Sequence, residues 1–180
     1  RMEGKIKKTI TTSTTFLLGF MACGKSSYGR KAANRLDLPF IDLDNTIEKS
    51  QGMTISELFQ KQGEAKFRAI EKEILQSILP QPGIISLGGG TVCNPEVWPL
   101  LKSNGVTVFL DMPFEQCLGR IRTSKKSRPL ASNLRDIEGI DKLRTLYEAR
   151  QDTYNRADHK LKFPYDHKSL ASKISKWLND

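Results

Sequence analysis

Residues 19–26 read GFMACGKS and match the pattern G-x-x-x-x-G-K-S at every fixed position. An apolar run at 15–18 precedes them, and apolar residues at helical spacing follow over 25–36. A strand, a turn and a helix N-terminus in succession are the context in which this pattern binds phosphate. We therefore predict a nucleoside triphosphate site and disfavour a chance match in an ordinary glycine-containing turn.

The loop residues supply the groups that a triphosphate needs. Glycines let the turn close, so that backbone N–H groups point at the phosphates, and the helix dipole favours the anion. Lys25 provides a point charge for the outer phosphates, and the Ser26 hydroxyl can ligate the magnesium that accompanies them. Cys23 stands where any small residue is tolerated, so we interpret it as filler.

Length and composition indicate one α/β domain. The chain has 180 residues, of which 38% are hydrophobic and 27% charged, as in ordinary globular proteins. No apolar run approaches the length of a membrane span, and no signal-peptide segment is visible near the start. We assign residues 13–180 to the domain and interpret residues 1–12 as a short basic tail, part of which could derive from an expression tag.

Three cysteines, Cys23, Cys93 and Cys117, are scattered without a C-x-x-C pair or metal-ligand spacing. They favour neither a metal nor a redox role, and they suit the reducing cytoplasm.

The net charge of +9 would fit a nucleic-acid partner, but the basic residues do not alternate with aromatics as a base-stacking surface requires. We expect small anionic substrates, no nucleic acid, no membrane and a monomer.

Strand and helix patterns alternate along the chain, which predicts a parallel sheet with helices on both faces. We expect strands at 15–18, 39–44, 84–87, 106–110 and 159–163. We expect helices at 25–36, from 54 to near 63, and at 64–79, 94–101, 113–122, 140–154 and 168–178. Residues 123–137 break the periodicity, carry several basic side chains and form a loop whose length indicates a functional role.

Acidic and glycine residues follow two of these strands. Asp42 and Asp44 alternate across a strand end, where a parallel sheet of this kind faces its ligand. One carboxylate could hold magnesium through water while the other accepts a proton from a substrate hydroxyl. Gly88, Gly89 and Gly90 follow the next strand, and their backbone could approach a ligand closely. A solvated acidic turn and a merely flexible glycine turn are the simpler alternatives.

Two arginines lie where plain amphipathicity would not place them. Arg150 lies on or beside the apolar face of its helix, and Arg68 follows Phe67 one turn before Glu71. An exposed Arg68–Glu71 pair would contribute only a few tenths of a kcal/mol. Alternatively, Glu71 orients Arg68, and the two guanidinium groups bind the carboxylate of a small acid.

Six segments in this order and spacing resemble the shikimate kinase family over residues 13–180: GFMACGKSSYGR, FIDLDNTIE, EAKFRAIEKEIL, ISLGGGTV, SRPL and the helix ending YEAR. The resemblance implies a three-layer αβα P-loop kinase fold with a central parallel sheet of about five strands. It implies substrate-binding helices at about 44–79 and a lid at about 123–137. It also implies transfer of the γ-phosphoryl of ATP to the 3-hydroxyl of shikimate, on the route to chorismate and the aromatic amino acids.

The resemblance also implies roles for individual residues. Lys25, Asp44 and Arg128 would be catalytic, and Ser26 and Asp42 would hold Mg²⁺. The ATP contacts would be Gly19, Ala22, Cys23, Gly24, Lys25, Ser26, Ser27, Arg120 and Arg128. The shikimate contacts would be Asp44, Arg68, Gly88, Gly89, Gly90 and Arg150. Either Arg120 or Arg122 would pack on the adenine, and we favour Arg120.

The departures from the family pattern are small: Ala22 replaces a usual glycine, Ser27 a frequent threonine and Ala131 a common leucine. Ala22 adds a methyl group to a crowded loop, which bears on nucleotide affinity. Two other functions remain open at this point. One is a kinase of the same architecture acting on another hydroxy acid such as gluconate, and the other is a non-catalytic nucleotide-binding protein.

Overall fold

The computed structural model describes residues 13–125, 128, 131 and 134–180. The expected tail at 1–12 and parts of the expected lid lie outside the described residues. Within them, five parallel strands form one sheet in the order β2-β3-β1-β4-β5. The strands are β1 (Thr14–Leu18), β2 (Phe40–Asp42), β3 (Gly83–Ser86), β4 (Gly105–Asp111) and β5 (His159–Lys162). The predicted parallel sheet is confirmed.

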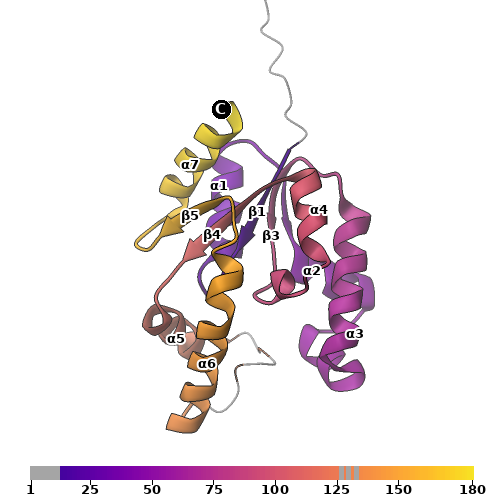
Figure 1. The fold of residues 1–180 in the computed structure, drawn as a ribbon, viewed down its shortest axis with the longest axis vertical. Coiled ribbons are helices and arrows are strands. Elements are labelled where there is room, and N and C mark those ends of the chain that lie inside the picture. Colours follow the sequence, from indigo (N-terminus) through magenta and orange to yellow (C-terminus); the bar gives the residue numbers. More distant parts are fainter. Residues whose placement is uncertain (1–12, 126–127, 129–130, 132–133) are drawn as a thin grey trace, which may run out of the picture.

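Helices cover both faces of the sheet (Figure 1). Helices α1 (Lys25–Arg35) and α7 (His167–Asn179) pack against each other on one face, and α4 (Val97–Asn104) lies on the opposite face. The other helices are α2 (Leu43–Gln51), α3 (Ile55–Ile78), α5 (Phe114–Thr123) and α6 (Ile137–Tyr154), with a 3₁₀ turn at Thr91–Cys93. In the described part of the chain, no helix has the length and apolarity that crossing a membrane demands.

The central strand sets the geometry of the site. All five residues of β1 are buried, and β1 pairs with β3 on one side and β4 on the other. A strand buried on both faces is mostly apolar rather than alternating, as the run at 15–18 indicated, and β1 also buries Thr14 and Thr15. Because the strands are parallel, their carboxyl ends meet at one edge, and the phosphate loop lies there between β1 and α1.

The expectation of a strand over 39–44 is wrong at its C-terminal end. Strand β2 stops at Asp42, and Asp44 lies in the first turn of α2. The Asp42 carboxylate accepts a hydrogen bond from the Asn45 N–H at 3.3 Å and so caps that helix. The two carboxylates therefore do not alternate across a strand, because Asp42 ends the strand and Asp44 belongs to a helix.

Helix boundaries were predicted with mixed success. The Thr54 capping box is present, and the break expected near Gly63 appears as a non-helical residue with φ 78° inside α3. The helix expected from Asn94 begins instead at Val97, because the Asn94 side chain accepts from the Glu96 N–H in a turn. Helix α6 begins at Ile137, where Asp136 provides the N-cap.

Candidate functional site

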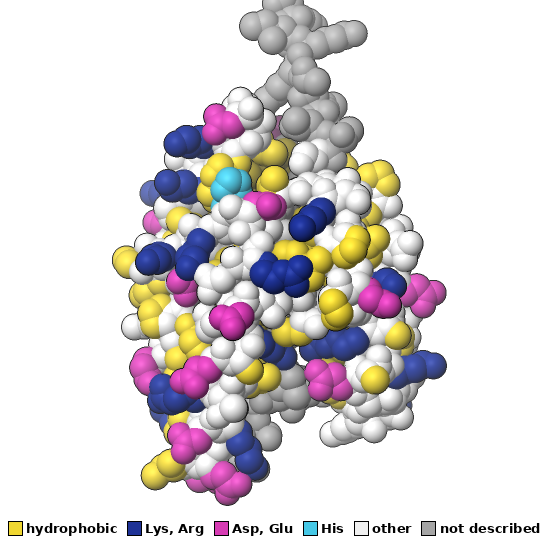
Figure 2. All heavy atoms as spheres, viewed as in Figure 1, with side chains coloured by type: hydrophobic (Ala, Val, Ile, Leu, Met, Phe, Trp, Pro, Cys, Tyr) yellow, Lys and Arg dark blue, Asp and Glu magenta, His cyan; other side chains and the backbone are white. Residues whose placement is uncertain are grey.

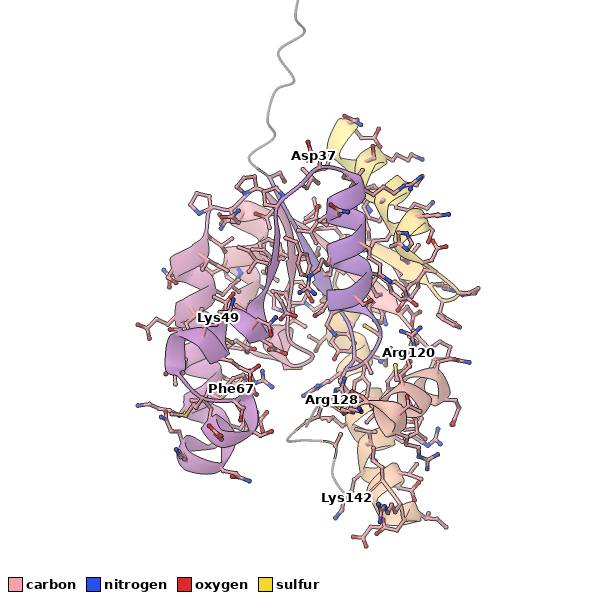
Figure 3. All side chains as sticks on the ribbon, turned by 180° about the vertical axis from the view of Figure 1, so that it is seen from behind. Asp37, Lys49, Phe67, Arg120, Arg128 and Lys142 are labelled. Carbon is pink, nitrogen blue, oxygen red and sulfur yellow. The ribbon has the colours of Figure 1, made fainter. Side chains whose placement is uncertain are left out.

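A cavity of about 330 Å³ opens at the carboxyl edge of the sheet, beside the phosphate loop. Figure 2 shows the surface hollowed in this region, with Lys and Arg side chains at the hollow. Figure 3 shows Phe67 of α3 and Arg128 on opposite sides of the space below the sheet. The predicted site residues that line the cavity are Ala22, Gly24, Lys25, Ser26, Ser27, Asp44, Arg68, Gly88, Gly89, Gly90, Arg128 and Arg150.

The phosphate loop holds its lysine against its own backbone. The Lys25 ammonium donates to the carbonyl oxygens of Gly19 at 2.8 Å and Phe20 at 2.9 Å, and the side chain is 7% exposed. Gly24 has φ 96°, a left-handed conformation that favours glycine, and it ends the loop as the N-cap of α1. A largely buried ammonium at a helix N-terminus makes this an anion site.

Ala22 adopts φ 62° in the same loop, although it carries a side chain. The left-handed region costs a non-glycine residue about 1–2 kcal/mol. Position 22 is also where the chain departs from the glycine usual in the family pattern by one methyl group. The structure adds that the backbone itself is strained there, which explains why glycine suits the position.

The groups that could hold magnesium follow one another across the sheet edge. The Ser26 hydroxyl lies 3.2 Å from the Ser86 hydroxyl, and Ser86 pairs in register with Asp42 on the neighbouring strand. The described residues contain no cluster of three or more His, Cys, Asp or Glu side chains suited to a metal. One hydroxyl and one carboxylate fit Mg²⁺, which keeps several waters and takes its other ligands from phosphate.

Asp44 and Arg128 interact across the cavity. Half-burial lowers the pKa of Arg128, and the negative charge of Asp44 opposes that effect. The Asp44 carboxylate also lies beside Gly88, where an added Cβ would be 2.9 Å from Oδ1. A carboxylate and a guanidinium group therefore face the same space from α2 and from the expected lid.

Arg68 and Glu71 form a pair with a buried carboxylate and a largely buried guanidinium group, rather than the exposed pair of the simpler alternative. Arg68 donates to Glu71 at 2.8 Å, and Thr91 donates to the other carboxylate oxygen at 2.8 Å. Glu71 is 1% exposed, and burial raises its pKa although the bonds from Arg68 and Thr91 offset part of the effect. For Arg68, burial lowers the pKa, but the attraction and hydrogen bond of Glu71 together with the attraction of Glu64 outweigh it, so the pKa of Arg68 is raised. Glu71 is more deeply buried than Arg68, so desolvation decides the direction in which its pKa shifts.

Arg150 reaches the same place from α6. It is 6% exposed, and an added Cβ at Gly90 would lie 2.9 Å from one of its guanidinium nitrogens and would collide with the guanidinium of Arg68. The two arginines therefore flank one glycine. Tyr154 lies one turn after Arg150 on α6. Its hydroxyl donates to the carbonyl oxygen of Gly89 and so holds the glycine turn at 88–90 against this helix.

The cavity has an apolar wall that the sequence reasoning missed. Its members are Met21, Ile55, Phe59, Phe67 and Leu87. The Phe59 and Phe67 rings lie 4.8 Å apart on either side of the break at Gly63, and the Arg68 guanidinium lies 5.0 Å from the Phe67 ring centre. The available signal was two phenylalanines on either side of a helix-breaking glycine.

Four predicted residues lie outside the cavity lining: Gly19, Cys23, Asp42 and Arg120. Cys23 belongs to the loop but is fully buried, and Asp42 caps α2. Arg120 lies beside the phosphate loop, where its guanidinium donates to the Tyr28 hydroxyl at 2.8 Å. The alternative candidate, Arg122, is exposed and donates to the Leu134 carbonyl at 3.4 Å.

A phosphate loop on a five-stranded parallel sheet, with a carboxylate and arginines across a cavity from it, defines a P-loop kinase. The profile described as shikimate kinase matches residues 21–179. The chain therefore belongs to the shikimate kinase family, and it is a phosphotransferase by class. The resemblance stated from the sequence is confirmed.

Individual relatives agree with this assignment. The chain is 40% identical over 148 residues to a shikimate kinase of Aquifex aeolicus, covering 82% of this chain and 84% of the relative. The solved structure of a shikimate kinase from Acinetobacter baumannii in complex with shikimate superposes with a TM-score of 0.84 at 31% identity, covering 94% of both chains. An APS kinase of Mycobacterium tuberculosis, at 15% identity and a TM-score of 0.58, shares the fold.

Proposed function

We propose that this chain transfers the γ-phosphoryl group of ATP to the 3-hydroxyl of shikimate, giving shikimate 3-phosphate and ADP for the route to chorismate and the aromatic amino acids. Family membership supports the reaction. The observation that carries the choice of substrate is the pair of guanidinium groups, Arg68 and Arg150, that flank Gly90 beside the phosphate loop. Forked donors match a carboxylate, which shikimate possesses.

On the nucleotide side, the loop amides and Lys25 would hold the triphosphate. Lys25 keeps its ammonium at the carbonyls of Gly19 and Phe20, and its third contact, 3.7 Å to the Cys23 sulfur, is the weak one that an outer phosphate would replace. Ser26 and Asp42 would hold Mg²⁺, which neutralises charge on the phosphates when bound. Arg120, beside the loop, would pack on the adenine.

On the acceptor side, Arg68 and Arg150 would bind the carboxylate, and the backbone of Gly89 would meet a hydroxyl. Asp44 would accept the proton from the 3-hydroxyl as its oxygen bonds to the γ-phosphorus and the bond to the β-phosphate oxygen breaks. Arg128 would stabilise the negative charge on the transferring group. Closure of the expected lid would exclude water, which otherwise hydrolyses ATP.

Shikimate-dependent release of ADP tests the proposal. We expect ADP release with ATP and shikimate, little release with ATP alone, and little with gluconate in place of shikimate. Faster turnover of gluconate would assign the chain to another hydroxy acid. Salt-dependent oligonucleotide binding without turnover would favour the non-catalytic alternative.

Two variants separate the halves of the site. Asp44→Asn and Arg68→Ala should impair shikimate binding or use while sparing ATP binding, because both side chains line the cavity and neither belongs to the phosphate loop. Calorimetric titration with each ligand measures this. Equal losses of ATP affinity in either variant would contradict the assignment.

We also propose that the protein works as a monomer in the cytoplasm. Its three cysteines are free, as a reducing compartment allows. Light scattering coupled to gel filtration measures the mass in solution, and a dimer mass would contradict the first part of this proposal.

A further inference from the structure

Tyr28, in the first turn of α1, lies against the end of the phosphate loop. Its half-buried ring packs so closely on Gly24 that an added Cβ at that glycine would collide with the ring edge. The same Cβ would lie 3.4 Å from a guanidinium nitrogen of Arg120. The last loop glycine, Tyr28 and Arg120 therefore form one contact group outside the cavity lining.

Arg120 reaches this group from α5 and is held there by the tyrosine. Its guanidinium donates to the Tyr28 hydroxyl at 2.8 Å, and its Cζ lies 5.5 Å from the centre of the ring. Among the described residues, Arg120 forms no ion pair with a carboxylate. The phenol oxygen is therefore the group that fixes the direction of this guanidinium.

The tyrosine is itself braced from the loop that follows β5. The Tyr28 ring meets the Tyr165 ring edge-on, with centres 5.7 Å apart. Tyr165 is buried, and its hydroxyl donates to the carbonyl oxygen of Cys23 at 2.6 Å. Because the Tyr165 hydroxyl bonds to the backbone of the phosphate loop, a chain of contacts runs from that loop through Tyr165 and Tyr28 to Arg120.

We propose that Tyr28 is a positioning residue for the nucleoside: it holds the Arg120 guanidinium beside the phosphate loop, so that a planar cationic face is already in place when the base arrives. The inference rests on the proposed role of Arg120 at the adenine. A guanidinium group stacks well on aromatic rings, and a side chain that is ordered in advance loses less entropy on binding. Tyr28 acts through Arg120 and is not expected to touch the reacting atoms.

The test is Tyr28→Phe, which keeps the ring against Gly24 and removes the hydroxyl that bonds Arg120. We expect the Kd of ATP, measured by calorimetry, to rise about fivefold, as for one side chain that must be ordered on binding. The Kd of inorganic tripolyphosphate should not change, because it carries no base. An equal loss for both ligands would show that Tyr28 shapes the phosphate loop instead, and no loss for ATP would show that it positions nothing; either overturns the inference.

A double-mutant cycle with Arg120→Ala gives the second arm. In the Arg120→Ala background, Tyr28→Phe should cause no further loss of ATP affinity, and an undiminished loss would overturn the inference. Tyr147→Phe is the matched control, since it removes a hydroxyl bonded to the Met112 carbonyl and should leave the Kd of ATP unchanged. Binding of ATP is measured without shikimate, so failure of the chain to phosphorylate shikimate would be seen separately.

Discussion

Arg68 and Glu71 are joined at 2.8 Å, one turn apart on α3, and the carboxylate of the pair is 1% exposed. The Thr91 hydroxyl donates a second hydrogen bond to the other carboxylate oxygen of Glu71, so both oxygens have a partner. The guanidinium thereby keeps one fixed direction, towards Gly90 and the cavity. A buried charge held by two bonds is costly to disturb, so this pair governs several expected properties of the protein.

Glu71→Gln should raise the KM of shikimate about tenfold and leave the KM of ATP unchanged. The amide keeps the shape of the side chain but no longer offers a full charge to Arg68, and a hydrogen bond to a charged group contributes about 1.5–3 kcal/mol. Steady-state kinetics with each substrate varied in turn measure the effect. Glu73→Gln, an exposed glutamate of the same helix, is the control, and an equal effect in both variants would contradict the prediction.

The pH dependence of stability should carry the signature of Glu71. Burial raises the pKa of Glu71 in the folded state, so that state binds its proton more tightly than the unfolded chain. This contribution to the free energy of unfolding is complete below the unfolded pKa and is lost as pH rises through the folded pKa. The stability of the wild type minus that of Glu71→Gln should therefore fall as pH rises above the usual range of a glutamate, in urea titrations. A flat or rising difference would refute this.

Arg128→Ala should lower kcat about 10³-fold while shikimate binding stays intact, since an arginine that neutralises the transferring phosphoryl acts mainly in the transition state. Rapid-quench measurement of shikimate phosphorylation tests kcat, and calorimetry tests binding. Lys142→Ala provides the control, because Lys142 lies near the outer end of α6 (Figure 3) and pairs with Glu138 on the surface. Unchanged turnover in Arg128→Ala would remove this arginine from the mechanism.

Ala22→Gly should behave unlike an ordinary alanine-to-glycine change. At Ala149, exposed in the interior of α6, such a change should lower the free energy of unfolding by about 1 kcal/mol. At Ala22 the relief of the left-handed backbone at φ 62° offsets that cost. We expect Ala22→Gly to be more stable than Ala149→Gly by about 1 kcal/mol in denaturant titrations. Equal losses at the two positions would show that Ala22 is unstrained.

A thiol reagent should modify one cysteine of the native protein and three of the unfolded protein. Cys93 is exposed, whereas Cys23 and Cys117 are buried, and burial raises the pKa of Cys117 to about 12. The thiolate is the reactive form, so Cys117 is unreactive at neutral pH. Titration with a chromogenic disulfide counts the thiols. Fast reaction of native Cys93→Ser would contradict the burial of the other two.

The phosphate loop, the alternation of strands and helices and the family were readable from the chain itself. Each depends on residues close together in sequence: GFMACGKS between an apolar run and a helix, a capping box at Thr54, and apolar periods of two or 3.6. Local backbone preference and the burial of one face decide such patterns, so they can be recognised without knowing which helices and strands pack against each other. The end of β2 was misread although Asp42 and Asn45 are close in sequence, because an aspartate after an apolar run suits both the end of a strand and the N-cap of a helix.

Contacts between distant segments were decided by packing in three dimensions. Helical spacing placed Glu71 near Arg68, but only the turn at Thr91 and the surrounding core make that pair buried. Arg150, Phe59 and Arg120 likewise acquire their surroundings from elements many residues away, because the sheet order brings those elements together. Burial and desolvation depend on the whole fold, and no spacing along one chain reports them.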